Sequence, residues 1–172
     1  MVDAAALKIV IYPDPVLKQK AQEVDPIDDN VRAVAARMIE LMYEADGVGL
    51  AAPQVGLPWR MFVTRAREDD NVDRVFVNPV LTFHDKTLTD LEEGCLSLPG
   101  INADIRRPKG VTIEALDEQG TAFSLKDDDF GARVWQHEFD HLEGVLILDR
   151  QTVRDRLANR KAVKNLEARA SG

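Results

Sequence analysis

The residues best suited to chemistry lie in one short segment, 136–141, which reads Gln-His-Glu-Phe-Asp-His. On a helix, side chains four positions apart share a face, so His137 and His141 can present their rings to one metal ion. Glu138 would stand beside that ion, where a carboxylate can exchange protons with a bound water. A polar helix with two ordinary histidines is the simpler interpretation, but two of the chain's three histidines fall in this pattern. The spacing therefore predicts a metal-binding helix.

A helix over residues 129–142 would hold these side chains in place. Its expected start is rich in acids, at positions 127–129, which suit an N-cap and the positive end of the helix dipole. Phe130 and Val134 fall on the same face as the two histidines. The face that carries the chemistry is therefore expected to be partly apolar.

The remaining chain shows both helical and extended patterns. Apolar residues recur every three or four positions from 28 to 45, which predicts an N-terminal amphipathic helix, and a narrow apolar stripe predicts a C-terminal surface helix over 151–170. Extended segments are expected at 60–65, 74–77, 80–91, 111–116, 121–125 and 145–148. Because helices and strands are interspersed without strict alternation, we expect an α+β fold, with mixed or antiparallel sheets packed around the central metal-binding helix. We expect one catalytic domain over 1–172, with residues 1–6 as a flexible N-terminus.

Composition limits the classes of function. The chain has 172 residues, 45% of them hydrophobic and 30% charged, as in ordinary globular proteins. Its net charge of −8 argues against non-specific binding to nucleic acid or to an anionic membrane. A single cysteine excludes an intramolecular disulfide, and neither a targeting segment nor a membrane span is evident. We therefore expect a cytoplasmic protein.

Two histidines leave a metal short of a ligand, and the sequence offers three candidates for the third. They are Cys95, His84 and Glu167. Glu167 falls in the expected surface helix, whereas Cys95 lies between Gly94, which allows a close approach of the chain, and a Pro-Gly turn at 99–100. A lone cysteine is more often a small buried hydrophobic residue, but beside this histidine pattern we favour Cys95 as the ligand.

Residues 47–56 form a segment rich in glycine and alanine. A phosphate-binding loop is a weak interpretation, because no Lys-Ser or Lys-Thr follows. A backbone that another molecule can approach closely is better suited to the edge of a cleft, where its N–H and C=O groups can pair with an extended ligand.

Three motifs follow one another along the chain. Residues 47–54 read Gly-Val-Gly-Leu-Ala-Ala-Pro-Gln, residues 93–97 read Glu-Gly-Cys-Leu-Ser, and the histidine segment is 136–141. Together, and with the opening segment 11–17, they resemble the peptide deformylase family over nearly the whole chain. The resemblance implies a metal-dependent hydrolase that removes the N-formyl group, as formate, from the N-terminal formyl-methionine of newly made polypeptides.

The resemblance first implies a metal centre. Cys95, His137 and His141 would bind one divalent metal, and Glu138 would act as general base and later pass its proton to the leaving amine. The cysteine thiolate cancels one of the metal's charges, so a bound water is acidified less than in an all-histidine site and more depends on Glu138. The family works with Fe(2+), while one sulfur and two nitrogens also suit Zn(2+), Ni(2+) or Co(2+).

The resemblance also implies how a substrate would be bound. The Gln54 side-chain amide and the backbone N–H of Leu96 would donate hydrogen bonds to the oxyanion. The cleft edge at Gly49 would pair with the substrate's main chain. The methionine side chain would enter an apolar pocket formed by Val48, Leu91, Phe130, Val134 and the ring of His137.

Some charged residues and two departures from the family pattern complete the prediction. Glu93 is expected to pair with Arg107 and Asp140 to anchor the helix, although an ordinary salt bridge or cap would explain both equally well. Asn102 stands near where many family members have a basic residue, which puts the grip on the distal peptide backbone in doubt. Trp135 is bulky for its place.

The expected partners are formyl-methionyl nascent peptides, with transient visits to the ribosome and no binding to nucleic acid or membrane. Two other hypotheses remain open. One is a metallopeptidase that takes Glu167 as its third ligand, and the other is a non-catalytic module that captures formylated N-termini or uses its metal structurally.

Overall fold

A computed structural model describes all 172 residues. Its strands form one five-stranded sheet in the order β1-β2-β3-β4-β5, with every neighbouring pair antiparallel. They are β1 Gly49–Ala51, β2 Met61–Thr64, β3 Arg74–Gly94, β4 Asn102–Leu116 and β5 Ala122–Asp127. This is the α+β arrangement predicted from the sequence, and the sheet is antiparallel rather than mixed.

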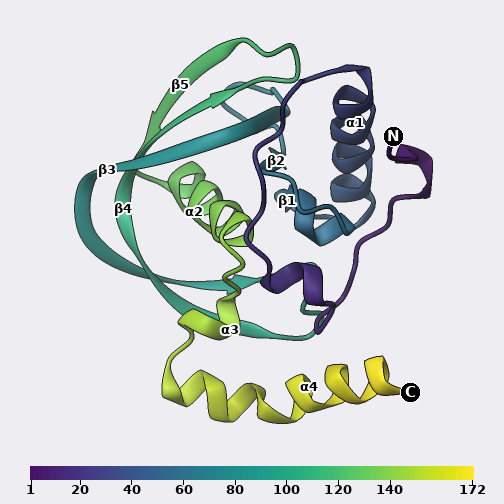
Figure 1. Cartoon of the computed structure of the whole chain (residues 1–172). Helices are drawn as coiled ribbons and strands as arrows, with labels where there is room; N and C mark the ends of the chain where they lie inside the picture. The colour runs from purple at the N-terminus through teal and green to yellow at the C-terminus, as the bar shows by residue number, and fades with distance from the viewer.

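The dominant element is the long hairpin of β3 and β4, which curves around a helix in the middle of the molecule (Figure 1). The sequence predicted separate extended segments at 74–77 and 80–91, but the structure joins them in β3. Register shifts between Val77 and Val80, and again between Phe83 and Leu88, interrupt the pairing. Bulges of this kind bend a strand, and they also break the alternation by which a continuous strand is recognised.

Two helices cover opposite faces of the sheet. Helix α1, Asp29–Glu44, starts where the Asp28 carboxylate accepts a hydrogen bond from the N–H of Val31, and its apolar face packs on one side of β2. Helix α2, Phe130–Leu142, packs on the other side. Successive residues of β2 point to opposite faces, so Met61 and Val63 contact the α1 cluster and Phe62 the α2 cluster.

The start of helix α2 is stabilised by an acidic side chain three residues before it. The Asp127 carboxylate accepts a hydrogen bond from the N–H of Ala132 at 3.1 Å and pairs with Arg67 at 2.9 Å. Farther along, the Gln136 amide donates to the carbonyl oxygen of Pro108 on β4 at 2.9 Å. The helix is thus tied at both points to the strands that surround it.

The C-terminal region differs in part from the sequence prediction. The predicted buried strand over 145–148 is wrong. Residues Ile147–Arg150 form the short helix α3, which begins where the Asp149 carboxylate accepts a hydrogen bond from the N–H of Leu146. Helix α4, Val153–Ser171, follows and lies along the outside of the molecule (Figure 1).

At the N-terminus, Ala4–Ala6 form a short 3-10 turn. The backbone of Val2 exchanges hydrogen bonds with the Asn30 side chain at the start of α1. None of the helices is both long and apolar enough to cross a membrane.

Candidate metal centre and cleft

Three side chains that can bind a metal converge beside α2. The ligand atoms of Cys95, His137 and His141 all lie within 4.8 Å of one another, and Cys95 Sγ is 3.6 Å from His141 Nε2. Donor atoms around a tetrahedral ion with bonds of 2.0–2.3 Å stand about 3.3–3.8 Å apart, so small shifts would complete such a site. The other two candidate ligands lie elsewhere: His84 is within 3.3 Å of the Thr112 hydroxyl, and Glu167 accepts a hydrogen bond from Tyr12.

Local structure explains how the three meet. The two histidines are one turn apart on α2, with ring centroids 5.1 Å apart. Cys95 directly follows β3, in a turn closed by a hydrogen bond from the N–H of Leu98 to the Cys95 carbonyl oxygen. A Cβ at position 94 would stand 2.8 Å from Asn102 Oδ1, so glycine there lets β3 and β4 stay close at the point where the cysteine is presented.

The Glu93 carboxylate fixes the orientation of His137. Its pKa would be raised by burial, but hydrogen bonds from Arg107 and His137 outweigh that effect and hold it at about 2. An ionised carboxylate only accepts, so the contact of 2.8 Å between Glu93 Oε1 and His137 Nδ1 places the proton on Nδ1. His137 Nε2 is thereby left free to bind a metal.

Behind Glu93 lies a buried group of opposite charges. Arg107 pairs with Glu93 at 2.7 and 2.9 Å and with Asp140 at 2.8 Å. Asp140 also accepts from Arg150 at 2.6 and 2.9 Å. Arg107 and Glu93 are buried, so each charge is compensated away from water.

Glu138 is the most isolated acid of the site. It is 3% exposed, and its Oε2 has no hydrogen-bond partner. Burial raises its pKa to about 7, although the charge on His137 opposes the rise. A Cβ at Gly49 would stand 2.6 Å from Glu138 Oε1, so the glycine on β1 makes room for this carboxylate. A carboxyl group with a pKa near 7 is suited to both taking and giving a proton.

The two histidine rings have opposite tendencies. Burial would lower the pKa of His137, but its hydrogen bonds with Cys95 and Glu93 raise it to about 10. Burial, followed by the charge on His137, lowers the pKa of His141. The surroundings of the two rings therefore stabilise one positive charge, carried by the protonated His137 ring. A bound cation would supply that charge in place of the proton. The residues present fit a divalent metal bound by one sulfur and two nitrogens.

Gln54 lies directly beside the cysteine. Its Oε1 accepts from the N–H of Ala51 at 3.0 Å, and its Nε2 lies 3.4 Å from Cys95 Sγ and 3.3 Å from the Ser97 hydroxyl. The amide is thus held with its donor end towards the metal centre. The backbone N–H of Leu96 donates to no other group of the chain.

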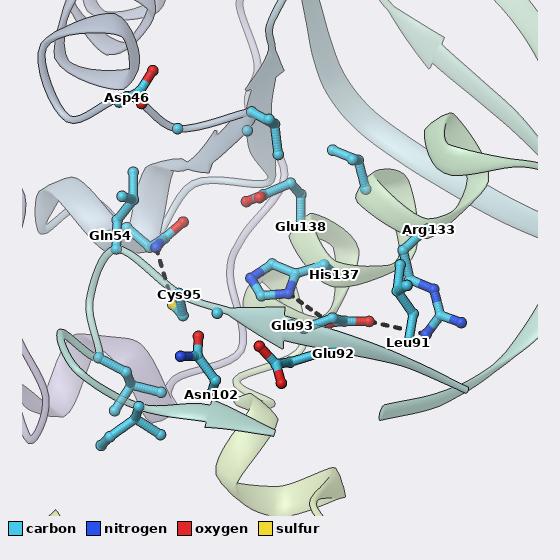
Figure 2. A pocket seen from close by; sticks show the side chains of 18 of the residues that line it. Asp46, Gln54, Leu91, Glu92, Glu93, Cys95, Asn102, Arg133, His137 and Glu138 are labelled. Atoms are coloured by element: carbon cyan, nitrogen blue, oxygen red, sulfur yellow. Dashed lines mark hydrogen bonds and ion pairs between the residues drawn. The ribbon is translucent and has the colours of Figure 1, made fainter. Parts of the chain in front are cut away.

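A cleft of about 370 Å³ opens onto this centre (Figure 2). Its walls include Gly49 on the sheet edge together with all the side chains predicted for the methionine pocket, namely Val48, Leu91, Phe130, Val134 and His137. Val48, Leu91 and Phe130 are each more than 40% exposed. Apolar side chains are therefore left uncovered at the mouth of the cleft.

The two residues that depart from the family pattern, Trp135 and Asn102, lie in different environments. Trp135 is 7% exposed and packs with its ring centroid 6.2 Å from that of Phe76, so its bulk fills the core between α2 and the sheet. Asn102 lines the cleft opposite Gly94 and brings no charge to that rim.

Sequence reasoning missed three side chains that contact the site. Ser97 contacts Gln54, Arg150 contacts Asp140, and Arg133 reaches Glu93 from α2. Arg133 gave one usable signal: it lies four positions before His137 and so shares its helix face.

Comparisons with known proteins identify the family of this chain. A family model described as polypeptide deformylase matches residues 6–157. The chloroplastic peptide deformylase 1B of Oryza sativa is 42% identical over 163 residues, which cover 94% of this chain and 61% of that protein. The peptide deformylase of Borreliella burgdorferi is 45% identical over 145 residues, covering 83% and 86%. A solved Plasmodium falciparum peptide deformylase in complex with an inhibitor has a TM-score of 0.86 at 38% identity, covering 94% of this chain and 99% of that one.

The coverage differs between plant and bacterial relatives. The chain spans 61%, 53% and 54% of the length of the proteins from Oryza sativa, Solanum lycopersicum and Arabidopsis thaliana. It spans 86% of the Borreliella protein. The family model and the relatives named above each match most of this chain. The chain therefore belongs to the polypeptide deformylase family.

Proposed function

We propose that this chain removes the N-formyl group, as formate, from the N-terminal formyl-methionine of newly made polypeptides. One observation carries the proposal: Cys95, His137 and His141 converge at the end of an apolar cleft, next to a buried Glu138 that has a pKa of about 7. Membership of the deformylase family, whose members depend on a metal, supports the same reaction.

The proposed ligands are Cys95, His137 and His141 on one divalent metal. We propose Fe(2+) as the working ion, with Zn(2+), Ni(2+) or Co(2+) as possible substitutes, since all suit one thiolate and two imidazoles. A bound metal would supply Lewis acidity at the formyl carbonyl and lower the pKa of a water molecule. Glu93 would keep the His137 proton on Nδ1, and Arg107 and Asp140 would hold Glu93 and the helix in place.

Glu138 is the proposed proton carrier. It takes a proton from the attacking water as the O–C bond to the formyl carbon forms. It then delivers that proton to the nitrogen as the C–N bond breaks, which leaves formate and a free amino terminus. A cation on the neighbouring ligands would lower the pKa of Glu138 by attraction and so favour the ionised base at neutral pH.

The tetrahedral intermediate carries a negative oxygen, and two donors lie near the centre. The Gln54 amide is held by the N–H of Ala51 with its Nε2 towards Cys95. The N–H of Leu96, the residue after the cysteine, has no other acceptor in the chain. Donors already oriented in this way need no rearrangement as charge develops, which is the basis of oxyanion stabilisation.

The substrate is proposed to lie along the edge of the sheet. β1 pairs with β2 on one side only, so an extended peptide can pair with the free edge at Gly49. Its first side chain would then enter the pocket of Val48, Leu91, Phe130 and Val134. Main-chain pairing does not depend on the substrate's side chains. Selectivity among peptide sequences is therefore expected mainly at the first residue.

The wider setting stays a prediction at several points. We propose that residues 1–172 form one catalytic domain, with nascent formyl-methionyl peptides as substrates and transient proximity to the ribosome. We propose no binding to nucleic acid or membrane, in keeping with the net charge of −8. The cytoplasmic location also stays a prediction, and the plant relatives bear names that place them in the chloroplast or mitochondrion.

The test is formate release from formyl-Met-Ala-Ser by protein purified without oxygen and reloaded with Fe(2+). Wild type should turn over, Glu138→Ala should lose about 10²–10⁴-fold in rate while keeping its metal, and Cys95→Ala should lose the metal itself. Glu167→Ala on α4 is the matched control and should resemble wild type, because its carboxylate contacts the Tyr12 hydroxyl and neither residue lines the cleft.

Two results would contradict the proposal. If folded, metal-loaded wild type releases no formate, the chain is better explained as a module that captures formylated N-termini. If Cys95→Ala keeps both metal and turnover, the proposed ligand set is wrong.

A further inference from the structure

Arg133 is a buried arginine to which the mechanism above gives no role. It lies on α2 one turn before His137 and is 9% exposed. Its Nη1 donates to Glu93 Oε2 at 3.0 Å and to the carbonyl oxygen of Ile105 at 2.8 Å. Its Nη2 donates to the carbonyl and hydroxyl oxygens of Thr89 at 2.9 and 3.0 Å. One side chain thus joins α2 to both strands of the long hairpin.

The contact with Glu93 completes the set of donors around that carboxylate. Glu93 Oε1 receives His137 Nδ1 at 2.8 Å and Arg107 Nη2 at 2.9 Å, and Oε2 receives Arg107 Nε at 2.7 Å and Arg133 at 3.0 Å. Each oxygen therefore has two donors, and Figure 2 shows the carboxylate lying between His137 and Arg133.

The two arginines hold Glu93 in different ways. Arg107 comes from β4 and binds both oxygens as a fork, which ties the carboxylate to the hairpin. Arg133 comes from α2, the helix that also carries His137, and so ties the carboxylate to the helix. Without Arg133, the only direct hydrogen bond between Glu93 and α2 would be the one with His137, and the remaining link would run indirectly through Arg107 to Asp140.

We infer that Arg133 is a positioning residue for His137: by holding Glu93 Oε2 from the same helix face, it keeps Oε1 on the Nδ1 proton and Nε2 directed at the metal. The inference rests on the proposed metal centre, and it adds a residue that acts through Glu93. The rival explanation is a structural brace, in which Arg133 only ties Thr89 and Ile105 to α2.

The test measures how tightly the metal is held and where the His137 proton lies, and it does not depend on catalytic turnover. The full chain is loaded with Zn(2+), and its release to a chelator is followed beside the ¹⁵N NMR signal of His137 Nδ1–H. Arg133→Met should release zinc about 10–100-fold faster than wild type, as expected when a group that orients a ligand is lost, and should broaden or shift the Nδ1–H signal. Thr89→Val removes one bond of Arg133 and leaves Glu93 untouched, so it should release zinc at the wild-type rate.

Arg133→Lys separates the two roles if the methionine variant folds poorly. Lysine keeps a cationic donor for Glu93 but cannot reach all four acceptors, so it should melt at a lower temperature than wild type and release zinc within about threefold of it. Zinc release that follows melting temperature across the three variants, with an unchanged His137 signal, would overturn the inference in favour of the brace. Failure of the wild type to release formate would instead count against the proposed function, because zinc release and the NMR signal do not depend on turnover.

Discussion

Helices α2 and α4 are held to the molecule in opposite ways. Ten of the thirteen residues of α2 are buried, including four that are charged or can be charged by a proton. Of the nineteen residues of α4, only Leu166 is buried. Figure 1 shows α2 within the curve of the β3–β4 hairpin and α4 along the outside.

The difference shows what a chemical site demands of its helix. Buried polar groups are costly unless they have hydrogen-bond partners, and most of those on α2 have them, the exceptions being Glu138 Oε2 and His141 Nδ1 at the metal centre. Asp140 receives Arg107 and Arg150, while Gln136 donates to a carbonyl oxygen of β4. α4 contacts the same hairpin through exposed polar bonds, such as that from Asn159 to the carbonyl oxygen of Asn102. The helix that carries the proposed ligands is thus enclosed and hydrogen-bonded by its surroundings, whereas α4 lies on the surface with one buried side chain.

The largest effect on stability is expected from Arg107→Met. It leaves Glu93 and Asp140 buried with fewer compensating charges, and breaking a buried pair from one side costs about 3–5 kcal/mol. Arg106→Met is the neighbouring control, since its partner Asp90 is exposed and such pairs contribute at most about 1 kcal/mol. Urea unfolding measures both. Equal losses for the two arginines would mean that the charges around α2 are no more important than those on the surface.

A pair of leucines compares the packing of the two helices directly. Leu142→Ala removes a fully buried side chain at the end of α2, and the enclosing sheet cannot close the space, so a loss of about 3–5 kcal/mol in the free energy of unfolding is expected. Leu166→Ala on α4 should cost about 2 kcal/mol, because an outer helix can shift to fill the gap. A larger loss at Leu166 would reverse the comparison.

Glu138 should make the stability of the metal-free protein depend on pH. Its folded pKa of about 7 is above the ordinary 4.5, so between these values the folded state holds the proton more tightly than the unfolded state. Its contribution is therefore full below pH 4.5 and is lost as pH rises to about 7, by up to about 3 kcal/mol. Glu138→Gln should lack this fall. The unfolding free energies of the two proteins, measured from pH 4 to 8, would contradict the idea if they ran parallel.

Local sequence signals predicted the parts of the site that lie within one element. His137, Glu138 and His141 follow from spacing on a helix, and α1 follows from its apolar period. That Cys95 stands beside α2 depends on how β3 ends against that helix, some forty residues away in the chain. Its setting between Gly94 and the Pro-Gly turn favoured it over His84 and Glu167, and the resemblance to a known family supported that choice.

Other features could not be read locally. The bulges of β3 break its alternation, so one strand looked like two. The run 145–148 is apolar and short, a pattern that does not distinguish a strand from a helix. In the structure the Asp149 carboxylate accepts a hydrogen bond from the N–H of Leu146 and caps α3. Arg133 was missed because its four acceptors come from two strands that are distant in the sequence.

The smallest effect should come from Leu157→Glu, on the outer side of α4. Leu157 is 67% exposed, so replacing it removes little contact, and surface substitutions of this kind usually change stability by no more than about 0.5 kcal/mol. Urea unfolding and light scattering on the same samples should give wild-type values. A loss above 1 kcal/mol, or a change in molecular mass, would mean that Leu157 and its neighbour Val153 are covered in solution, and α4 would then be an interface rather than a loosely attached helix.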